Sequence, residues 1–458
     1  MATSASPQPS EGPAAAAAGL GDVEGAAAGL GRHGALTVAV TVATLCANLL
    51  TGVLLARVLG PEGRGEITAI LAAIPIVGWL FSVGCREAVT YHHSKRPQDG
   101  GALVATWLVL IVPLAIVAIL AGQALLPRVL AAQDEETLQL ARLLMVSLVF
   151  FFLSEVVYGV LLGDRDFVFY NGMRLGQPLV IAASYVGLAA VGALSVETAV
   201  LATFLASVAD TLVVGTRVWR RHGVARPDAG LAARTLWYGA RAHGTSAGGA
   251  VTARLDLMII PAFLSAASVG LYSVATNVSW IVFAVSASLA ALVLPAAAAQ
   301  QAGGRRTVVR SLHATLAIGI VGAAGLAAIA GVAVPLAYGN AFAESVGPLR
   351  ALLAGSVLYA GAAVLFSGLY ALERPFTAAL SQGGGIVVTV VGLLLFLEDG
   401  GIWAAAIVSS VAYATVFLTA LAFYRRAASL TWRELVPERD TVRRSWRLAA
   451  RHVFARPG

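Results

Sequence analysis

The feature that most constrains this chain is a succession of apolar runs, each about 20 residues long, that fills most of its length. A helix of that length spans the hydrocarbon core of a bilayer. The chain is 58% hydrophobic and 12% charged, which is typical of a polytopic membrane protein and not of a soluble one. We therefore predict an all-α protein with about twelve transmembrane helices. The expected spans are 35–59, 66–93, 101–125, 139–163, 174–193, 197–218, 236–263, 268–297, 312–337, 348–371, 375–397 and 401–424.

The basic residues divide unequally between the two sides of the predicted bundle. With the N-terminus placed inside the cell, 24 of the 31 Lys and Arg residues lie in inner segments, and five lie in outer segments or at outer helix ends. Cytoplasmic loops of membrane proteins carry an excess of this kind. We therefore expect a multi-pass protein of the cytoplasmic membrane with both termini in the cytoplasm.

A turn between two apolar runs occurs twice in the chain. The alignment matches residues 56–70 (ARVLGPEGRGEITAI) with residues 261–275 (PAFLSAASVGLYSVA), and it pairs Gly65 with Gly270. Internal repeats are common in transporters, whose substrate site lies between the repeats. The expected organisation is a disordered cytoplasmic tail at 1–34, a first six-helix half at 35–218, a basic cytoplasmic linker at 219–235, a second six-helix half at 236–424 and a basic amphipathic cytoplasmic tail at 425–458.

The first of these turns is charged and the second is not. Arg57, Glu62, Arg64 and Glu66 all fall in or next to it, and its Gly and Pro residues are typical of a tight turn. We interpret the charges as a solvated turn whose arginines anchor at the level of the lipid headgroups. A second interpretation makes Arg57 part of the outer rim of a cationic cavity.

Several charged residues interrupt the predicted spans. A charged side chain at mid-membrane costs roughly 2.5–3.5 kcal/mol on insertion scales, so it faces protein or water. Arginines around a cavity would attract an anionic phosphate, because the guanidinium fork matches phosphate geometry. The candidate substrate-binding residues are Arg57, Arg86, Arg241 and Arg254, and the candidates for coupling to protons or sodium are Asp256, Glu155 and Asp210. In the alternative interpretation these arginines and acids only neutralise one another or reach the interface.

The sequence offers no pattern for a cofactor or a catalytic centre. The sole lysine, Lys95, follows no glycine loop, so there is no Walker A site for ATP. Cys46 and Cys85 lie inside predicted spans and support neither a disulfide framework nor a metal site. We expect a protein that is not an enzyme and needs no cofactor.

Four segments resemble a known family. They are LLARVLGPEGRGEITAILA, RLDLMIIPAFLSAASVGLYSVATN, GDRDFVFYNGMRLGQP and LERPFTAALSQGGGIVVTVVGLLL. In this order they resemble the polysaccharide-export branch, with its Wzx-type flippases, of the multidrug/oligosaccharidyl-lipid/polysaccharide exporter superfamily. The resemblance covers residues 35–424. It implies a V-shaped pair of six-helix lobes that moves a polyprenyl-diphosphate-linked oligosaccharide to the outer leaflet by alternating access.

Other functions remain open from the sequence. Within transport, the rivals are a peptidoglycan-precursor flippase of the MurJ type and a drug/cation antiporter of the same superfamily. From other classes, the rivals are a polytopic glycosyltransferase or polymerase and a non-transporting scaffold. The short outer loops argue against the polymerase. The expected partners are a lipid-linked anionic glycan, membrane lipids and, as a further candidate, polysaccharide assembly proteins, but not nucleic acid.

Overall fold

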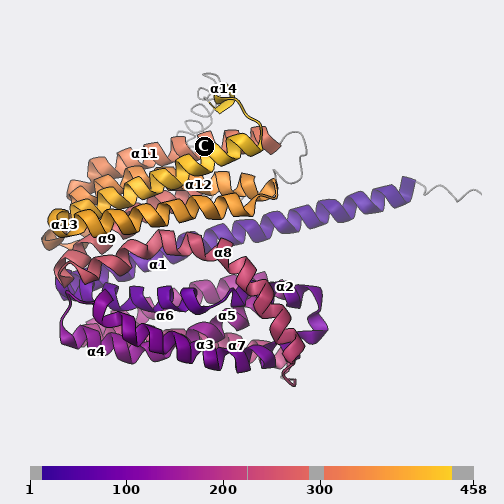
Figure 1. Ribbon diagram of the computed structural model, residues 1–458, viewed down its shortest axis with the longest axis horizontal. Coiled ribbons are helices and arrows are strands. Elements are labelled where there is room, and N and C mark those ends of the chain that lie inside the picture. Colours follow the sequence, from indigo (N-terminus) through magenta and orange to yellow (C-terminus); the bar gives the residue numbers. More distant parts are fainter. Residues whose placement is uncertain (1–12, 224, 288–303, 436–458) are drawn as a thin grey trace, which may run out of the picture.

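The computed structural model describes residues 13–223, 225–287 and 304–435, and for residues 13–38, 244–250 and 253 it describes the backbone alone. Every regular element in this part of the chain is helical, which confirms the predicted all-α fold (Figure 1). The longer elements are α1 (Pro13–Phe81), α2 (Cys85–Lys95), α3 (Gly100–Val129), α4 (Glu135–Leu144), α5 (Leu148–Gly163), α6 (Phe167–Ala190), α7 (Val196–His222), α8 (Ala229–Ile259), α9 (Ala266–Ala287), α11 (Gly304–Tyr338), α12 (Val346–Ala371) and α13 (Pro375–Ala427). Short elements are the 3-10 turns η1 (Pro97–Asp99), η2 (Met145–Ser147), η3 (Ile260–Ala262) and η4 (Asn340–Ser345), and the four-residue helix α14 (Trp432–Leu435).

The helices are consistent with twelve membrane crossings. Eight of them are long and apolar enough to cross a membrane. Two of these eight contain a sharp bend at a glycine with positive φ, Gly60 in α1 and Gly401 in α13, so each supplies two crossings. By length alone, α6, with 24 residues, and α8, with 31 residues, could supply the remaining two.

The boundaries differ from the expected ones at two places. Residues 13–34 were expected to be disordered but are helical, as the start of α1; the segment combines eight alanines, which favour a helix, with six glycines, which disfavour one. The expected span 66–93 is broken between Phe81 and Cys85. At the break, a side chain on Gly84 would place its Cβ 2.2 Å from the carbonyl oxygen of Gly239, so a glycine is needed where α8 passes. The amphipathic helix expected in the C-terminal tail lies outside the described residues.

The two halves of the chain form separate packed bodies. Trp107, Phe152 and Met145 are fully buried in the first body, and Tyr272 and Phe342 are fully buried in the second. Figure 1 shows helices α2–α7 on one side and α9 and α11–α13 on the other, with α1 and α8 between them. This arrangement places the boundary between the halves along α1, α8 and α9.

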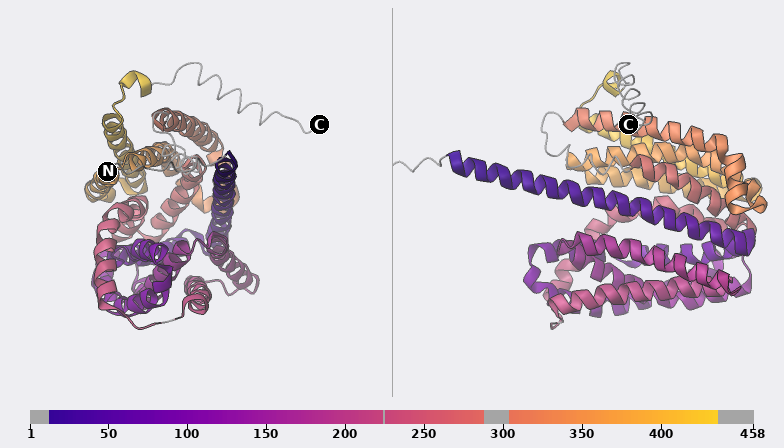
Figure 2. Two further views of the ribbon diagram at one scale, coloured as in Figure 1. Left: turned by 90° about the vertical axis from the view of Figure 1, so that its right-hand side faces the viewer. Right: turned by 180° about the vertical axis from the view of Figure 1, so that it is seen from behind.

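The opening helix of each half crosses to the other half. Leu49, Val53 and Ala56 of α1 pack into the core of the second half, beside Tyr272. The start of α8 packs into the core of the first half, where Leu231 is buried. The reverse view in Figure 2 shows α1 running between the two bodies. The opening helix of each half therefore contacts both bodies, which ties the two bodies together through long helices.

Candidate functional site

The two glycines that the sequence repeat aligns lie against each other. A Cβ on Gly65 would fall 1.7 Å from the carbonyl oxygen of Ala266 and 2.9 Å from the backbone nitrogen of Gly270. A Cβ on Gly270 would fall 1.9 Å from the carbonyl oxygen of Pro61. Helices α1 and α9 thus meet backbone to backbone, which only small residues permit. We call this end of the bundle, where α1 and α13 bend at Gly60 and Gly401, the closed end.

Further polar contacts join the halves at the closed end. Gln133 of the first half donates from Nε2 to the carbonyl oxygens of Pro261 (3.0 Å) and Leu264 (2.9 Å). Arg57 donates to the carbonyl oxygens of Leu336 and, over 2.8 Å, of Ala337 in the last turn of α11. Arginine satisfies otherwise unpaired carbonyls at a helix C-terminus in this way. The donors of Arg57 are therefore engaged in joining the halves.

Arg64 is buried at the same interface. Arg64 is 8% exposed, and its Nε donates a hydrogen bond of 3.3 Å to the Ser273 hydroxyl of α9. Among the described residues, no acid forms an ion pair with it. The interpretation of this turn as fully solvated is wrong for Arg64. The close contact of Gly65 with Gly270 presses α1 onto α9 and covers the preceding side chain.

Arg254 is a second cation at this interface. It lies on α8, and its guanidinium carbon is 5.5 Å from the ring centroid of Trp280 on α9, which is a cation–π contact. It is near enough to Arg64 to act on it electrostatically. In the part of the chain that the structure describes, no acid forms a salt bridge with Arg254. Two buried or half-buried arginines that form no salt bridge in the described part of the chain thus lie along the boundary between the halves, and Arg254 also acts electrostatically on the buried Asp256.

A cavity of about 720 Å³ lies in the first half, and several charged side chains interrupt its mostly apolar wall. Arg86 lines it and forms a salt bridge of 2.5 Å, from Nη2 to Oε1 of Glu155. Asp210 also lines it and accepts hydrogen bonds of 2.8 and 3.0 Å from the Tyr158 hydroxyl. Two of the predicted charges, Arg86 and Glu155, therefore neutralise each other. The cavity wall holds two arginines and three acids, so it carries no excess of positive charge.

Two other predicted residues lie apart from this cavity. Asp256 is 2% exposed and accepts hydrogen bonds from the Tyr272 hydroxyl (2.6 Å), the Ser409 hydroxyl (3.2 Å) and the backbone N–H of Leu257 (2.8 Å). These contacts tie α8 to α9 and α13. Arg241 is exposed in the first half of α8, twelve residues after its start, and its guanidinium carbon is 5.9 Å from the ring centroid of Trp237. The structure therefore groups Arg86, Glu155 and Asp210 but separates them from Arg57, Arg241 and Asp256.

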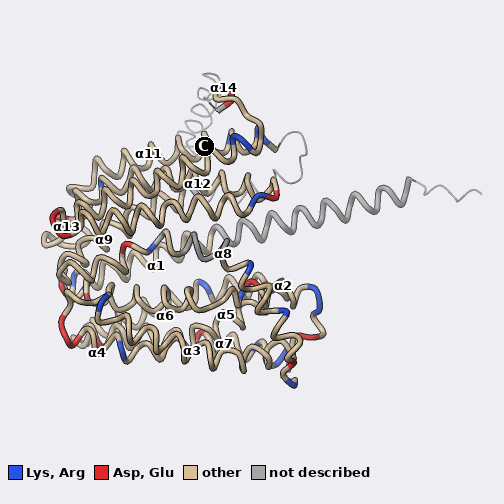
Figure 3. The backbone as a smooth tube through the Cα atoms, viewed as in Figure 1, with Lys and Arg blue, Asp and Glu red and all other residues tan. Residues whose placement is uncertain are grey.

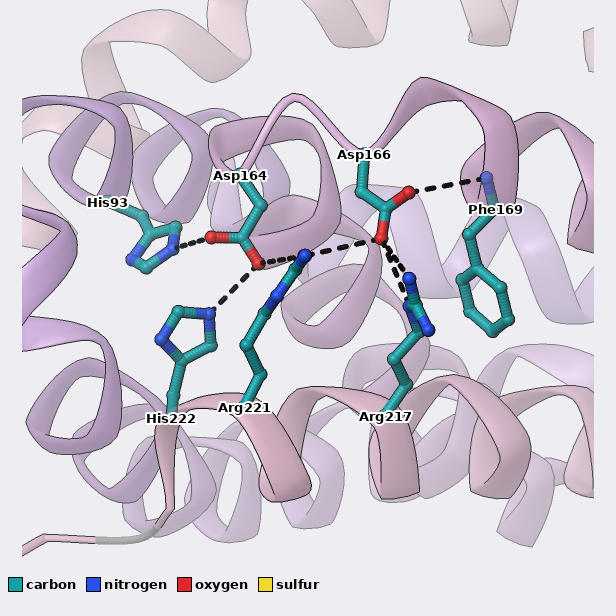
Figure 4. A network of polar contacts seen from close by, with 7 residues as sticks. All are labelled: His93, Asp164, Asp166, Phe169, Arg217, Arg221 and His222. Carbon is teal, nitrogen blue, oxygen red and sulfur yellow. Dashed lines mark hydrogen bonds and ion pairs between the residues drawn. The ribbon is translucent and has the colours of Figure 1, made fainter.

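A dense network lies at the opposite end of the first half (Figure 4). Asp164, in the turn between α5 and α6, accepts hydrogen bonds from Nε2 of His93 (2.8 Å) and Nε2 of His222 (2.9 Å). Arg221 contacts both Asp164 (3.3 Å) and Asp166 (3.2 Å). Burial raises the pKa of Asp164, but the hydrogen bonds from His222 and His93 outweigh it, so the net effect is a lowered pKa. We call these residues, together with Arg217, the Asp164 network.

The Asp164 network has the residue types of a metal site but is occupied by hydrogen bonds. The possible ligand atoms of His93, Asp164 and His222 lie within 4.8 Å of one another. A metal-bound histidine donates its other ring N–H to a partner, whereas Nδ1 of His93 is buried and has none. The guanidinium of Arg221 also already compensates the Asp164 carboxylate. The geometry fits a cross-link between α2, α7 and the α5–α6 turn.

Sequence reasoning missed several polar residues of the cavity and the interface. Arg174, Tyr158 and Gln177 line the cavity, although only Arg174 carries a charge that a search for intramembrane ions could have found. Arg64 had a usable signal, because it directly precedes the glycine that the repeat pairs with Gly270. Figure 3 shows why charge alone is a weak guide, since most Lys, Arg, Asp and Glu residues gather at the two ends of the bundle.

Solved structures share this fold at low sequence identity. The lipid II flippase MurJ in an inward closed conformation has a TM-score of 0.75 and 14% identity, covering 92% of this chain and 93% of that chain. A multidrug resistance MATE family transporter of the MOP superfamily, in an inward-facing conformation, has a TM-score of 0.69 and 15% identity, covering 84% and 95%. A MOP superfamily transporter from Pyrococcus furiosus has a TM-score of 0.57 and 16% identity, covering 87% and 95%. The expected exporter fold with two halves is confirmed.

The sequence itself matches a family model. No curated protein sequence matches the chain. Residues 54–347, well over half of the chain, match the model of a family described as polysaccharide biosynthesis protein. The match begins just before the charged turn and includes both Gly65 and Gly270. This multi-pass membrane protein therefore belongs to the polysaccharide biosynthesis protein family.

Proposed function

We propose that the protein is a flippase that moves a polyprenyl-diphosphate-linked oligosaccharide across the cytoplasmic membrane by alternating access between its two halves. The observation that carries this proposal is the pair of arginines at the boundary between the halves, Arg64 and Arg254, neither of which forms a salt bridge among the described residues. A buried cation is costly unless a counter-charge neutralises it. A diphosphate bound between the halves supplies that charge.

The sign of this charge separates the candidate substrates. A drug/cation antiporter needs acids where its substrate binds, and cations at the boundary would repel that substrate. Lipid II also carries a diphosphate, so a MurJ-type flippase shares the same chemistry. The polysaccharide biosynthesis family favours an oligosaccharide over a peptidoglycan precursor. Assembly proteins of the same polysaccharide are the partners that this function implies.

The closed end supplies the element that must change during transport. Gly65 and Gly270, Gln133, and Arg57 all join the halves at that end. By the excess of arginine in the opposite segments, this end faces the outside of the cell, and both termini are cytoplasmic. Release to the outer leaflet requires these contacts to separate.

Coupling to an ion gradient requires an acid that water can reach. Asp210 and Glu155 line the 720 Å³ cavity, whereas Asp256 is enclosed by three hydrogen bonds away from it. Glu155 is held by Arg86, which leaves Asp210 as the best placed of the three predicted acids to exchange a proton. We therefore rank Asp210 before Glu155, and Asp256 last.

A reconstituted transport assay tests the proposal. Proteoliposomes with a fluorescent polyprenyl-diphosphate oligosaccharide should show protein-dependent movement of the glycan between leaflets, and a drug cation should not be transported. Arg64→Gln should reduce glycan movement by at least about tenfold, the effect of losing one charge-assisted contact. The matched control is Arg128→Gln, an exposed arginine of α3 whose Nη1 bonds only to a carbonyl of its own helix. Equal rates in wild type and Arg64→Gln would refute the role of the unpaired arginines.

A further inference from the structure

A groove outside the cavity lies on the surface of the first half, beside the Asp164 network. Its volume is about 570 Å³, and it is formed by α6 and α7. Its walls combine apolar and cationic side chains, which is unusual for a surface in contact with lipid. The lining residues are Phe169, Leu212, Val213, Thr216, Arg217, Arg220 and Arg221.

The polarity of the groove changes along α7. Leu212 and Val213 are 54% and 50% exposed, at a depth where the helix faces acyl chains. Arg220 follows eight residues after Leu212, which is about 12 Å along a helix. Trp219, 65% exposed, stands next to it, and tryptophan marks the membrane–water interface. The groove therefore runs from the acyl region to the level of the headgroups.

The arginines of the groove are held in place but keep free donors. Arg217 donates from Nε and Nη2 to Asp166 over 3.0 and 2.7 Å, and its guanidinium carbon lies 4.4 Å from the Phe169 ring centroid (Figure 4). Nη1 of Arg217 has no hydrogen-bond partner in the described part of the chain. Arg220 is exposed, and no acid among the described residues pairs with it. The three arginines exceed Asp164 and Asp166 by one charge, which complements one phosphodiester.

We propose that this groove binds an anionic phospholipid, with the phosphodiester against Arg220 and Arg217 and an acyl chain along Leu212 and Val213. A soluble phosphate would use only the cationic end and leave the exposed aliphatic wall without a partner. A zwitterionic lipid would present its own cation to the arginines. The inference does not depend on the transported substrate, since the groove lies on the surface of one half and not between the halves.

Native mass spectrometry of the purified protein tests this site. With phosphatidylglycerol and phosphatidylcholine in equal amounts, phosphatidylglycerol should be retained preferentially. Arg220→Gln should weaken its retention about tenfold, as expected for the loss of one charge-assisted hydrogen bond. Arg226→Gln is the matched control, because Arg226 is exposed at the same end of the protein but does not line the groove. The melting temperature without added lipid should be the same for both variants.

Two further measurements make the outcome decisive. Val213→Asn should weaken phosphatidylglycerol binding without changing the charge of the groove, because it removes part of the aliphatic wall. Phosphatidylglycerol should raise the melting temperature of the protein, and inorganic phosphate at the same concentration should not. Equal retention of the two phospholipids, unchanged retention in Arg220→Gln, or equal stabilisation by inorganic phosphate would each overturn the assignment.

Discussion

The two polar regions within the membrane differ in how their charges are compensated. In the cavity of the first half, Arg86 forms a 2.5 Å salt bridge with Glu155, and Asp210 accepts from a tyrosine hydroxyl. At the boundary between the halves, Arg64 and Arg254 form no salt bridge in the described part of the chain, although Arg254 acts electrostatically on the buried Asp256. Compensated charges stabilise the fold they belong to. Uncompensated cations cost stability, and a protein keeps them where an anion binds.

The largest expected effect concerns the contact on which this boundary depends. Gly65→Val would drive a side chain into the carbonyl group of Ala266 and force α1 away from α9. We expect transport to be lost and the melting temperature to fall, measured in proteoliposomes and by thermal unfolding in detergent. Gly187→Ala is the control, since a Cβ on Gly187 meets open space. Normal transport by Gly65→Val would show that the backbone contact is dispensable.

The salt bridge between Arg86 and Glu155 has the next largest expected effect. Glu155→Gln removes the acid and leaves Arg86 half-buried without a counter-charge, which should lower the free energy of unfolding by about 1–3 kcal/mol. The double variant with Arg86→Gln should recover part of that loss, because no unpaired charge remains. Denaturant or thermal unfolding of the three proteins measures the difference. A double variant no more stable than Glu155→Gln would contradict a structural role for the pair.

The fold could be predicted further than the site because it depends on repeated patterns. The apolar runs and the arginine-rich segments specify many helices, and the sequence repeat pairs Gly65 with Gly270, the two glycines that the structure then places in contact between the halves. The site depends on which side chains a bend buries. Arg57 and Arg64 lie seven residues apart in one turn, yet one bonds to carbonyls of α11 and the other is buried against α9. Sequence spacing contains no information about that difference.

The Asp164 network is a second set of charges that compensate one another, and its two acids lie outside the predicted spans. The pKa of Asp164 is lowered in the folded state. The stabilisation that its carboxylate contributes is therefore present above the unfolded-state pKa of about 3.9, and it is lost as the pH falls through the folded-state pKa. Asp164→Asn should therefore lower the free energy of unfolding by about 1–2 kcal/mol at pH 7. The deficit relative to wild type should shrink below about pH 4. A deficit that stays constant from pH 7 to the acid range would exclude a role for the carboxylate charge.

The smallest expected effect on stability is at the unpaired arginines. Arg64→Gln removes a buried cation whose only side-chain partner among the described residues is a serine hydroxyl, so the free energy of unfolding should stay within about 1 kcal/mol of wild type or rise. The contrast with Glu155→Gln is the informative quantity, since both residues are buried in the helix bundle. Thermal unfolding without substrate measures it. A loss for Arg64→Gln as large as that for Glu155→Gln would place Arg64 among the compensated charges.

Binding of a diphosphate lipid to the purified protein tests the central claim most directly. Undecaprenyl diphosphate should raise the melting temperature of the wild type, and uncharged undecaprenol should not. The double variant Arg64→Gln, Arg254→Gln should fold with a similar melting temperature but lose the shift, because the cations that attract the diphosphate are gone. An equal shift in wild type and double variant would contradict the account, since the diphosphate would then bind elsewhere.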